Sequence, residues 1–476
     1  MGRGMGGWET GVVSALQVFV PLERELLVFA AFWFVIGLLD ELAIDLAWLW
    51  FRLTGKISTL RLPQGYGRAD LSGPVAVLVP TFQEAPVIGD TIRHMLAAWP
   101  QQALRLYIGC YCNDPATLAA AQAAAGSDGR VRLVVHGVAG PTTKADCLNR
   151  LYAALCADEQ RSRQPFHGVV LHDAEDMVHP AALQAIDSAL GQHDFVQLPV
   201  RPAEQPESRW VAGHYADEFA EAHAKGMVVR AALGAAIPAA GVGCGFARHA
   251  LTALAARRRS EGSTGPFAPE CLTEDYELGI MLSQQGRGST FLRLRDASGR
   301  LVATGSYFPT RLGTAIRQKT RWIHGIAFQA WDRMGWAASP IELWMALRDR
   351  RGPLTALVLS VAYLLLLVDG LFLLVEWAGG PVRPATSTPV HALLVVNVYG
   401  FAWRTVSRAA FTAREYGLRE GLRAVLRIPV ANVIAIMSGR RALVAYWRSL
   451  RGGAVVWDKT EHASHPSLAR LIGAKA

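Results

Sequence analysis

Carboxylates stand at the ends of three short apolar runs in the first half of the chain. Glu84 follows the first run and Asp114 the second, and the stretch HDAED after a later run supplies Asp173, Glu175 and Asp176. Carboxylate oxygens are the ligands that Mg²⁺ and Mn²⁺ take when these ions bridge substrate phosphates, and HDAED offers them within one turn of chain. The simpler alternatives are a helix cap for Asp114, which stands before a proline, and a solvated acidic turn for HDAED.

Short β-rich runs alternate with helical stretches around these acids, which predicts an α/β fold with a parallel sheet wound by helices on both faces. The expected strands are residues 75–79, 104–109, 131–135, 168–171 and 195–198. The expected helices are residues 87–98, 115–125, 144–157 and 181–190. Such sheets bind ligands at the carboxyl ends of their strands, so the three acidic segments are candidates for one shared site.

Several common sites are missing from the sequence. It has no GxxxxGK[ST] loop, no GxGxxG after the first strand and no GxSxG elbow, which removes the usual phosphate cradle of P-loop ATPases and dinucleotide-dependent oxidoreductases. The six cysteines form no CxxC pair, which argues against a disulfide framework and a zinc knuckle.

A hydrophobic content of 51% is high for a soluble enzyme, and long apolar stretches predict membrane helices. Residues 353–376 carry Asp369 as their one acidic side chain before Glu376 at the end, and are long enough to cross a hydrocarbon core of roughly 30 Å. A shorter third span is expected at residues 389–404.

The first expected span, residues 26–52, is equally apolar but contains Asp40, Glu41 and Asp45. A carboxylate at the bilayer centre costs about 2.5 to 3.5 kcal/mol, so these three must face protein or lie near the interface. A buried helix of a soluble domain is the alternative for this stretch.

The net charge of +9 is concentrated in part after the third span. Arg419, Arg423 and Arg427 recur at helical spacing, which favours basic amphipathic helices lying on anionic headgroups over residues 405–450, with a solvated face as the alternative. By the positive-inside rule this region is cytoplasmic, so we expect a membrane partner and no nucleic acid. The remaining divisions are an N-terminal segment 1–25, a cytoplasmic domain 70–335, an interfacial helix 336–352 and a cytoplasmic tail 451–476.

Further motifs extend the pattern of acids. In chain order the sequence reads VPTFQE, CND, TKADCLN, HDAED, GCG, LTEDYELG and QKTRW. In this order, over residues 75–329, the motifs resemble those of family 2 membrane glycosyltransferases, which include cellulose, chitin and hyaluronan synthases. The flanking LLDELAIDL, ALRDRRGPLT and VVWDKTEHASHP resemble the phage-adsorption protein B subgroup of bacterial inner-membrane members.

This resemblance implies a GT-A (Rossmann-like) cytoplasmic domain fused to transmembrane and interfacial helices, and an inverting transferase with a UDP-linked or similar nucleotide-sugar donor. The residues that it implies for donor binding are Glu84, Asp114, Lys144, Asp173, Gln318 and Arg321. Those implied for Mg²⁺ or Mn²⁺ are Asp173 and Glu175, with Asp176 to replace or assist Glu175 because relatives commonly have Asp-x-Asp. Asn113 stands where relatives often have a paired aspartate, which is a departure at the position implied for contact with the nucleobase.

The resemblance also implies Asp275 as the base that takes the proton of the attacking hydroxyl, with Glu274 beside it. The residues that it implies for the acceptor are Gly243, Cys244, Gly245 and Trp322. A tight turn for the glycines and a core or membrane-interface role for the tryptophan are the alternatives.

We therefore expect an inner-membrane hexosyl- or N-acetylhexosaminyltransferase that extends a surface or exopolysaccharide chain. Its partners would be a nucleotide sugar, a glycan or lipid-linked acceptor, the membrane and an envelope protein. The alternatives are a transferase that modifies a lipid-linked acceptor once, and an inactive scaffold or phage-receptor component.

Overall fold

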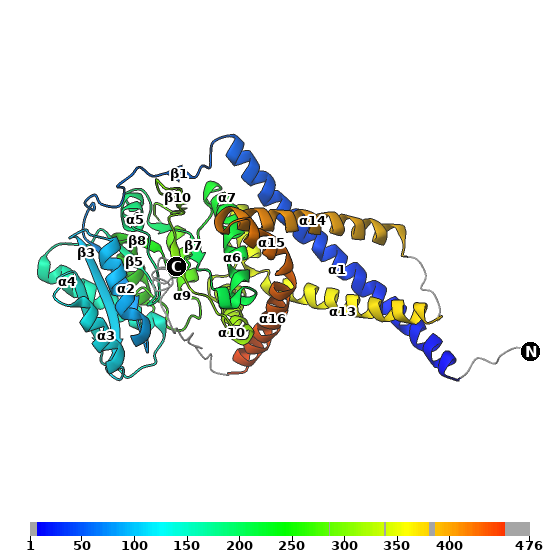
Figure 1. Cartoon of the computed structure of the whole chain (residues 1–476). Coiled ribbons are helices and arrows are strands. Elements are labelled where there is room, and N and C mark those ends of the chain that lie inside the picture. Colours follow the sequence, from blue (N-terminus) through cyan, green and yellow to red (C-terminus); the bar gives the residue numbers. More distant parts are fainter. Residues whose placement is uncertain (1–6, 285, 338, 380–385, 453–476) are drawn as a thin grey trace, which may run out of the picture.

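The computed structural model describes residues 7–284, 286–337, 339–379 and 386–452, with side chains from residue 20 onward. Figure 1 shows an α/β body from which three long helices project together: α1 (Gly7–Leu53), α13 (Gly352–Trp377) and α14 (Thr388–Tyr416). Most of the tail predicted at 451–476 lies outside the described residues.

A seven-stranded sheet forms the centre of the body, in the order β4-β3-β2-β5-β8-β6-β9. Its strands are β2 (Val75–Pro80), β3 (Leu104–Tyr111), β4 (Val131–His136), β5 (Gly168–Leu171), β6 (Phe195–Gln197), β8 (Cys244–Ala247) and β9 (Ser289–Phe291). Two parallel pairs flank it, β1 (Leu60–Arg61) with β10 (Leu294–Arg295) and β7 (Val200–Pro202) with β11 (Thr304–Ser306). The five predicted strands are confirmed.

The expectation of an all-parallel sheet is wrong at one strand. β8 runs antiparallel to both β5 and β6. Among its four residues, CGFA, only Phe246 favours strands, and Gly245 and Ala247 disfavour them, so its composition marks it weakly as a strand.

Helices cover the sheet and extend towards the long helices. They are α2 (Ala85–Ala98), α3 (Pro115–Ala125), α4 (Lys144–Ser162), α5 (Ala182–Leu190), α6 (Val211–Glu221), α7 (Met227–Ala232), α8 (Arg248–Ser260), α9 (Glu274–Ser283), α10 (Leu312–Ile323), α11 (Ala330–Met334) and α12 (Pro340–Arg350). Two π-helical turns, η2 (Ala222–Gly226) and η3 (His324–Gln329), extend α6 and α10. The four predicted helices are confirmed, α3 with the predicted bounds and α2, α4 and α5 with shifted ends.

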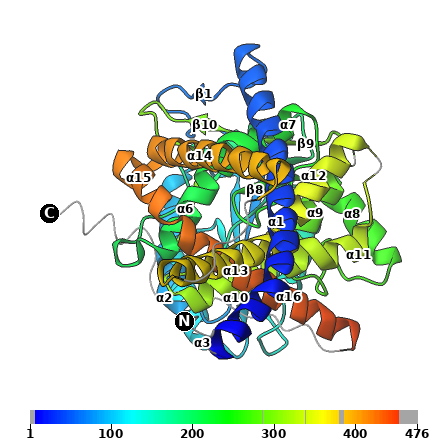
Figure 2. The same cartoon turned by 90° about the vertical axis from the view of Figure 1, so that its right-hand side faces the viewer.

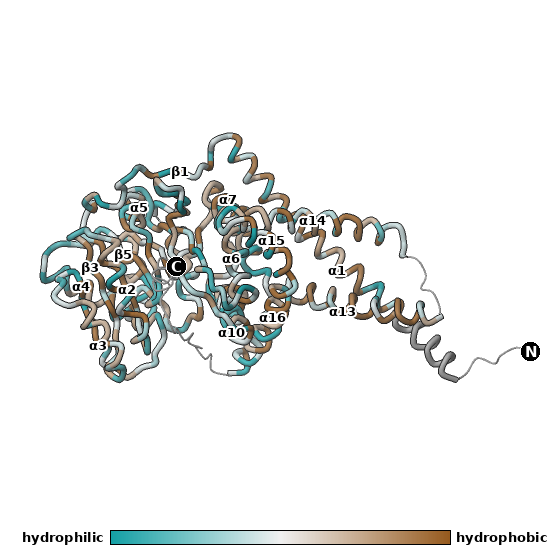
Figure 3. Tube along the Cα trace, in the orientation of Figure 1, coloured by the Kyte–Doolittle hydropathy of each residue, from teal (hydrophilic) through white to brown (hydrophobic). Residues whose placement is uncertain are grey.

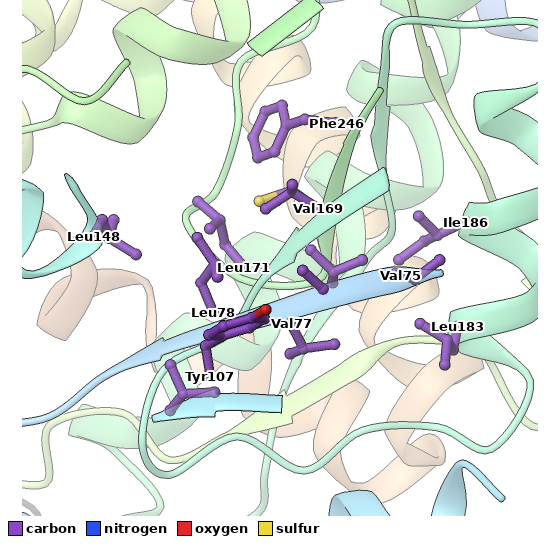
Figure 4. Close-up of a cluster of buried hydrophobic side chains, with 14 of the residues drawn as sticks. Val75, Val77, Leu78, Tyr107, Leu148, Val169, Leu171, Leu183, Ile186 and Phe246 are labelled. Carbon is purple, nitrogen blue, oxygen red and sulfur yellow. The ribbon is translucent and has the colours of Figure 1, made fainter. Parts of the chain in front are cut away.

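The hydrophobic core lies between the sheet and its helices. The run Val75–Val79 of β2 is fully buried, because a central strand covered on both faces has no solvent side. Figure 4 shows side chains of β2, β3 and β5 beside those of α4 and α5. This core holds the strand ends in a fixed register.

By length and composition, three helices within the described residues are long and apolar enough to cross a membrane: Val20–Leu53, Gly352–Trp377 and Ile428–Leu450. The first two agree with the predicted spans and carry long hydrophobic stretches in Figure 3. The third is α16, a region predicted as interfacial. The span predicted at 389–404 lies inside α14, which runs without a break to Tyr416 and stops at Gly417, where φ is +90°.

The carboxylates of α1 face protein, as the sequence required. Asp40, Glu41 and Asp45 contact four cations: Arg348 of α12, Arg351 between α12 and α13, Arg404 of α14 and Lys225 of η2. Arg404 and Lys225 both also contact Glu221 of α6, at 2.9 and 2.8 Å. This network joins α1 and α14 to the body and neutralises the acids near the point where the helices leave it.

The helix α15 (Leu418–Leu426) does not expose the predicted basic face in full. Its exposed residues include the three leucines Leu418, Leu422 and Leu426, while Arg427 is 1% exposed and contacts Asp217 of α6 at 3.0 Å. Arg427 therefore does not reach headgroups, which corrects the prediction for that residue. The reason is a partner far away in sequence: burial raises the pKa of Asp217 to about 6, and Arg427 offsets part of that cost.

Arg427→Ala is expected to destabilise the protein by about 3 to 5 kcal/mol, because it leaves Asp217 buried without its main counter-charge. Arg423→Ala is the matched control, since Arg423 pairs with Glu420 one turn away and more of its side chain is exposed, for an expected cost of about 0.2 to 1 kcal/mol. Thermal unfolding of the purified protein, followed by tryptophan fluorescence, compares them. Equal melting temperatures for the two variants would contradict the assignment.

Candidate active site

The candidate site lies at one edge of the central sheet. β2, β3 and β5 are parallel neighbours, so the segments that follow them, which hold Glu84, Asp114 and Asp173, emerge on the same side. β8 enters from the opposite direction, with Cys244 opposite Leu171, and so begins at this edge. The topology thus brings the three predicted acidic segments together.

Lys144 is the cation among these acids. It is the first residue of α4, whose start is fixed by a reciprocal capping box between Thr143 and Asp146. Its Nζ lies 2.5 Å from Oδ1 of Asp173. A Cβ at Gly241 would lie 2.3 Å from Oδ2 of Asp275 and 3.3 Å from Nζ of Lys144, so these two side chains meet over the glycine.

Asp275 and Glu274 form an acidic pair at the start of α9. Glu274 is 6% exposed, whereas Asp275 is partly open and accepts a hydrogen bond from the amide of Tyr276 at 2.8 Å. Burial and the neighbouring carboxylate raise the pKa of Glu274 to about 7, and burial also raises the pKa of Asp275. Lys144 and Arg321 act against both shifts, so Asp275 is an accessible carboxylate with enhanced basicity.

The HDAED segment separates its acids by environment. Asp176 is fully buried, and its Oδ2 lies 2.8 Å from Nδ1 of His172 and accepts the amide of Asp173 at 2.9 Å. Glu175 is 7% exposed, while about a third of the Asp173 side chain is open. Asp176 thus holds the turn that presents Asp173. No group of three or more His, Cys, Asp or Glu within the described residues is arranged to hold an ion by itself.

Asp114 and Asn113 hold loops at this edge. Asp114 caps α3 by accepting the amide of Thr117, and its other oxygen accepts the amide of Gln83, which has a φ of +54°. The capping alternative for Asp114 is therefore confirmed. Asn113 exchanges two hydrogen bonds of 2.8 Å with the backbone of Gly140. Its amide thus fastens the loop that precedes α4, and this accounts for an asparagine here.

Aromatic rings form a wall beside these loops. Phe82 meets Tyr111 edge to face at 5.2 Å between ring centroids, and Tyr111 stacks on His136 at 5.0 Å. A Cβ at Gly140 would lie 2.7 Å from the Phe82 ring, so this position needs glycine. Glu84 is 4% exposed, and its amide donates to Oγ1 of Thr117 at 2.9 Å.

The QKTRW motif lies on α10. Oε1 of Gln318 is buried and has no hydrogen-bond partner among the residues that the structure describes. The charge of Arg321 lowers the pKa of both Glu274 and Asp275, so this guanidinium lies within electrostatic range of the acidic pair. Trp322 meets Tyr215 edge to face at 6.1 Å, so part of its ring has the packing role given as its alternative.

The three residues of the GCG motif have different surroundings in the structure. Gly243 has a φ of +59°, and a Cβ there would lie 2.3 Å from Oγ1 of Thr304. Cys244 is fully buried, and burial with the nearby Asp275 raises the pKa of its thiol, which makes it a poor nucleophile. Gly245 lies deeper, where a Cβ would meet Ile186 of α5 at 2.1 Å. Packing alone thus explains that glycine.

Sequence reasoning missed Gly241, Gly325 and Tyr276. Gly241 admits the Asp275 carboxylate, and Gly325 lets η3 approach Thr273, from which a Cβ would be 2.4 Å. The signals available were weak: Gly241 stands two residues before the GCG motif, and Tyr276 directly follows Asp275.

Comparison with known proteins defines the class. The family model described as glycosyltransferase like family 2 matches residues 73–325, more than half of the chain. A solved mannosyltransferase from Pyrobaculum calidifontis, in complex with GDP-mannose and Mn²⁺, superimposes with a TM-score of 0.50 at 17% identity, covering 88% of this chain and 99% of its own, which shows the shared fold. The chain therefore belongs to glycosyltransferase family 2, has a GT-A-like sheet and is a glycosyltransferase by class.

Two curated relatives are more specific. The chain is 32% identical over 459 residues to bacteriophage adsorption protein B of Escherichia coli strain K12, and equally to bacteriophage N4 adsorption protein B of Escherichia coli O157:H7. The match covers 91% of this chain and 61% of each relative, so the chain spans less than two thirds of their length.

Proposed function

We propose that the protein transfers a sugar from a nucleotide-sugar donor, with inversion, onto a growing surface or exopolysaccharide chain. The observation that carries the proposal is that Lys144 and Asp275 meet over Gly241, with Asp173 in contact with Lys144. The acceptor hydroxyl gives its proton to Asp275, and its oxygen forms a bond to the anomeric carbon. The bond from that carbon to the nucleoside diphosphate breaks, and the diphosphate leaves with the electron pair. One displacement of this kind inverts the configuration.

The charges of the site suit the departing diphosphate. Lys144 and Arg321 supply positive charge beside the acids, and such fixed charge stabilises the transition state. Oε1 of the half-buried Gln318, which has no hydrogen-bond partner among the described residues, leaves one acceptor for a sugar hydroxyl. Phe82, which is partly exposed next to Glu84 and is held edge to face by Tyr111, offers an apolar ring to a nucleobase.

The residues present fit a divalent cation that is completed by substrate. The open carboxylate of Asp173 is an oxygen donor at the mouth of the site, with Glu175 two residues on, and Mg²⁺ typically takes one or two carboxylates plus phosphates and water. When bound, Mg²⁺ or Mn²⁺ would supply charge stabilisation of the leaving diphosphate. Asp176 positions Asp173 because its carboxylate accepts a hydrogen bond from the backbone amide of Asp173.

The projecting helices support a membrane setting. We assign the body to the cytoplasmic side of a bacterial inner membrane, with α1 and α13 as spans and with α14 beside them. Figure 2 looks at the body from the side of the projecting helices and shows α15 and α16 around their base. The exposed leucines of α15 would enter the headgroup boundary there. The relatives are named for bacteriophage adsorption, which suits a surface polymer and an envelope partner.

The test is release of nucleoside diphosphate by the purified full chain in detergent with Mn²⁺ or Mg²⁺. The panel comprises uridine- and guanosine-linked hexoses and N-acetylhexosamines. We expect release with one donor, loss on chelation with EDTA, and recovery when the ion is restored. Absence of both release and nucleotide binding across the panel would refute the proposal.

A further inference from the structure

The helix α12 connects the first membrane helix to the body. On one side, Nε1 of Trp344 donates to Oδ1 of Asp40 at 2.7 Å, and Arg348 contacts Glu41 at 3.1 Å. The chain then passes directly into α13, which begins at Gly352. α12 is therefore tied to two of the projecting helices.

On its other side, α12 places Asp349 in the body. Arg230 of α7, which is 5% exposed, binds both oxygens of Asp349 at 2.7 and 2.9 Å. The hydroxyl of Tyr276, also 5% exposed, donates to Oδ2 of Asp349 at 2.8 Å. One guanidinium nitrogen of Arg230, Nη1, and the hydroxyl of Tyr276 thus meet on one carboxylate, which fixes their relative positions.

Tyr276 passes this constraint to the acidic pair. Its side chain is held by Asp349, and its own amide donates to Oδ1 of Asp275 at 2.8 Å. The other side of Asp275 is Gly241. The segment before this glycine is held at Ala236, whose amide donates to Glu342 of α12 at 2.8 Å and whose carbonyl accepts from Nε of Arg230. The two groups that flank Asp275, Tyr276 and the segment that leads from Ala236 to Gly241, are thus both hydrogen-bonded to α12.

We propose that Asp349, acting through Tyr276, is a positioning residue that sets the orientation of the Asp275 carboxylate and couples the membrane helices to the sugar-transfer step. This inference rests on the proposed function, because Asp275 acts as the base there. The amide of Tyr276 can hold the Asp275 carboxylate in one orientation only if Tyr276 itself is fixed. Asp349 fixes Tyr276 by accepting the hydrogen bond of its hydroxyl.

Tyr276→Phe tests this, because it removes one hydroxyl and keeps the ring in its apolar pocket. Tyr107→Phe is the matched control, since its hydroxyl donates to Asp158 at 2.6 Å and Tyr107 lies on β3, within the core. Asp349→Asn is a second variant that weakens the pairing with Arg230. All are measured as full chains in detergent beside the wild type.

For Tyr276→Phe we expect kcat to fall about tenfold, with the KM for the donor within about twofold of wild type. The acid limb of the pH–rate profile should move to higher pH, because a looser amide stabilises the charged form of Asp275 less well. Asp349→Asn should shift the limb in the same direction, and Tyr107→Phe should leave it unchanged. A wild-type acid limb and kcat in Tyr276→Phe would overturn the inference, as would a loss of activity with an unmoved limb. A wild type that transfers no sugar overturns the proposed function instead.

Discussion

Asp275→Asn is expected to lower the rate of sugar transfer by about 10²- to 10⁴-fold, the usual contribution of a positioned general base. Asparagine keeps the shape of the side chain and still accepts the amide of Tyr276, but it cannot take a proton at neutral pH. The loss should therefore appear in kcat, because the donor binds through other groups. Steady-state release of nucleoside diphosphate measures the rate, and titration calorimetry with the free diphosphate measures binding.

The matched control for this variant is Asp90→Asn. Asp90 pairs with Arg93 on the surface of α2, one turn away, so its replacement should leave transfer unchanged. A wild-type kcat in Asp275→Asn would show that Asp275 is not the base. A wild type with no detectable sugar transfer would instead favour the inactive-scaffold alternative. Equal loss in both variants would point to a general folding defect.

Lys144→Met is expected to reduce kcat/KM by about 10²- to 10³-fold, the range found when one preorganised stabilising group is removed. The substitution keeps much of the aliphatic stem and removes the ammonium that contacts Asp173 at 2.5 Å. Asp173, Glu274 and Asp275 would then share one edge of the sheet without their nearest cation. Lys56→Met, on an exposed turn after α1, is the matched control.

The pH dependence of Lys144→Met gives a second, independent readout. Lys144 lowers the pKa of both Glu274 and Asp275 against the effect of burial. Without it these values rise, and since the base works only when deprotonated, the acid limb should move to higher pH and activity at low pH should be lost first. Lys144→Arg retains the charge and should restore the limb towards the wild-type position. If the acid limb of Lys144→Met stays at its wild-type position, Lys144 does not lower the pKa of the base.

Local patterns determined much of this protein. The predicted strands and helices are confirmed because apolar runs of strand length, prolines at helix starts and caps such as Asp114 act over a few residues. The acids of α1 had to meet protein, because a bilayer does not tolerate them, and the structure pairs them with arginines and Lys225. The order of the motifs was sufficient to indicate the glycosyltransferase family.

Only the tertiary structure decided which of these residues face the site and which hold it together. Asp176 turns away to His172, and Arg427 turns inward to Asp217, because each has a buried partner that residue spacing does not reveal. The antiparallel direction of β8 depends on how the chain returns from α7, and that direction brings Gly241 against Asp275. The link from Asp349 to Tyr276 joins elements that are distant in sequence. Long-range contacts of this kind arise from packing, and a local sequence pattern carries no record of them.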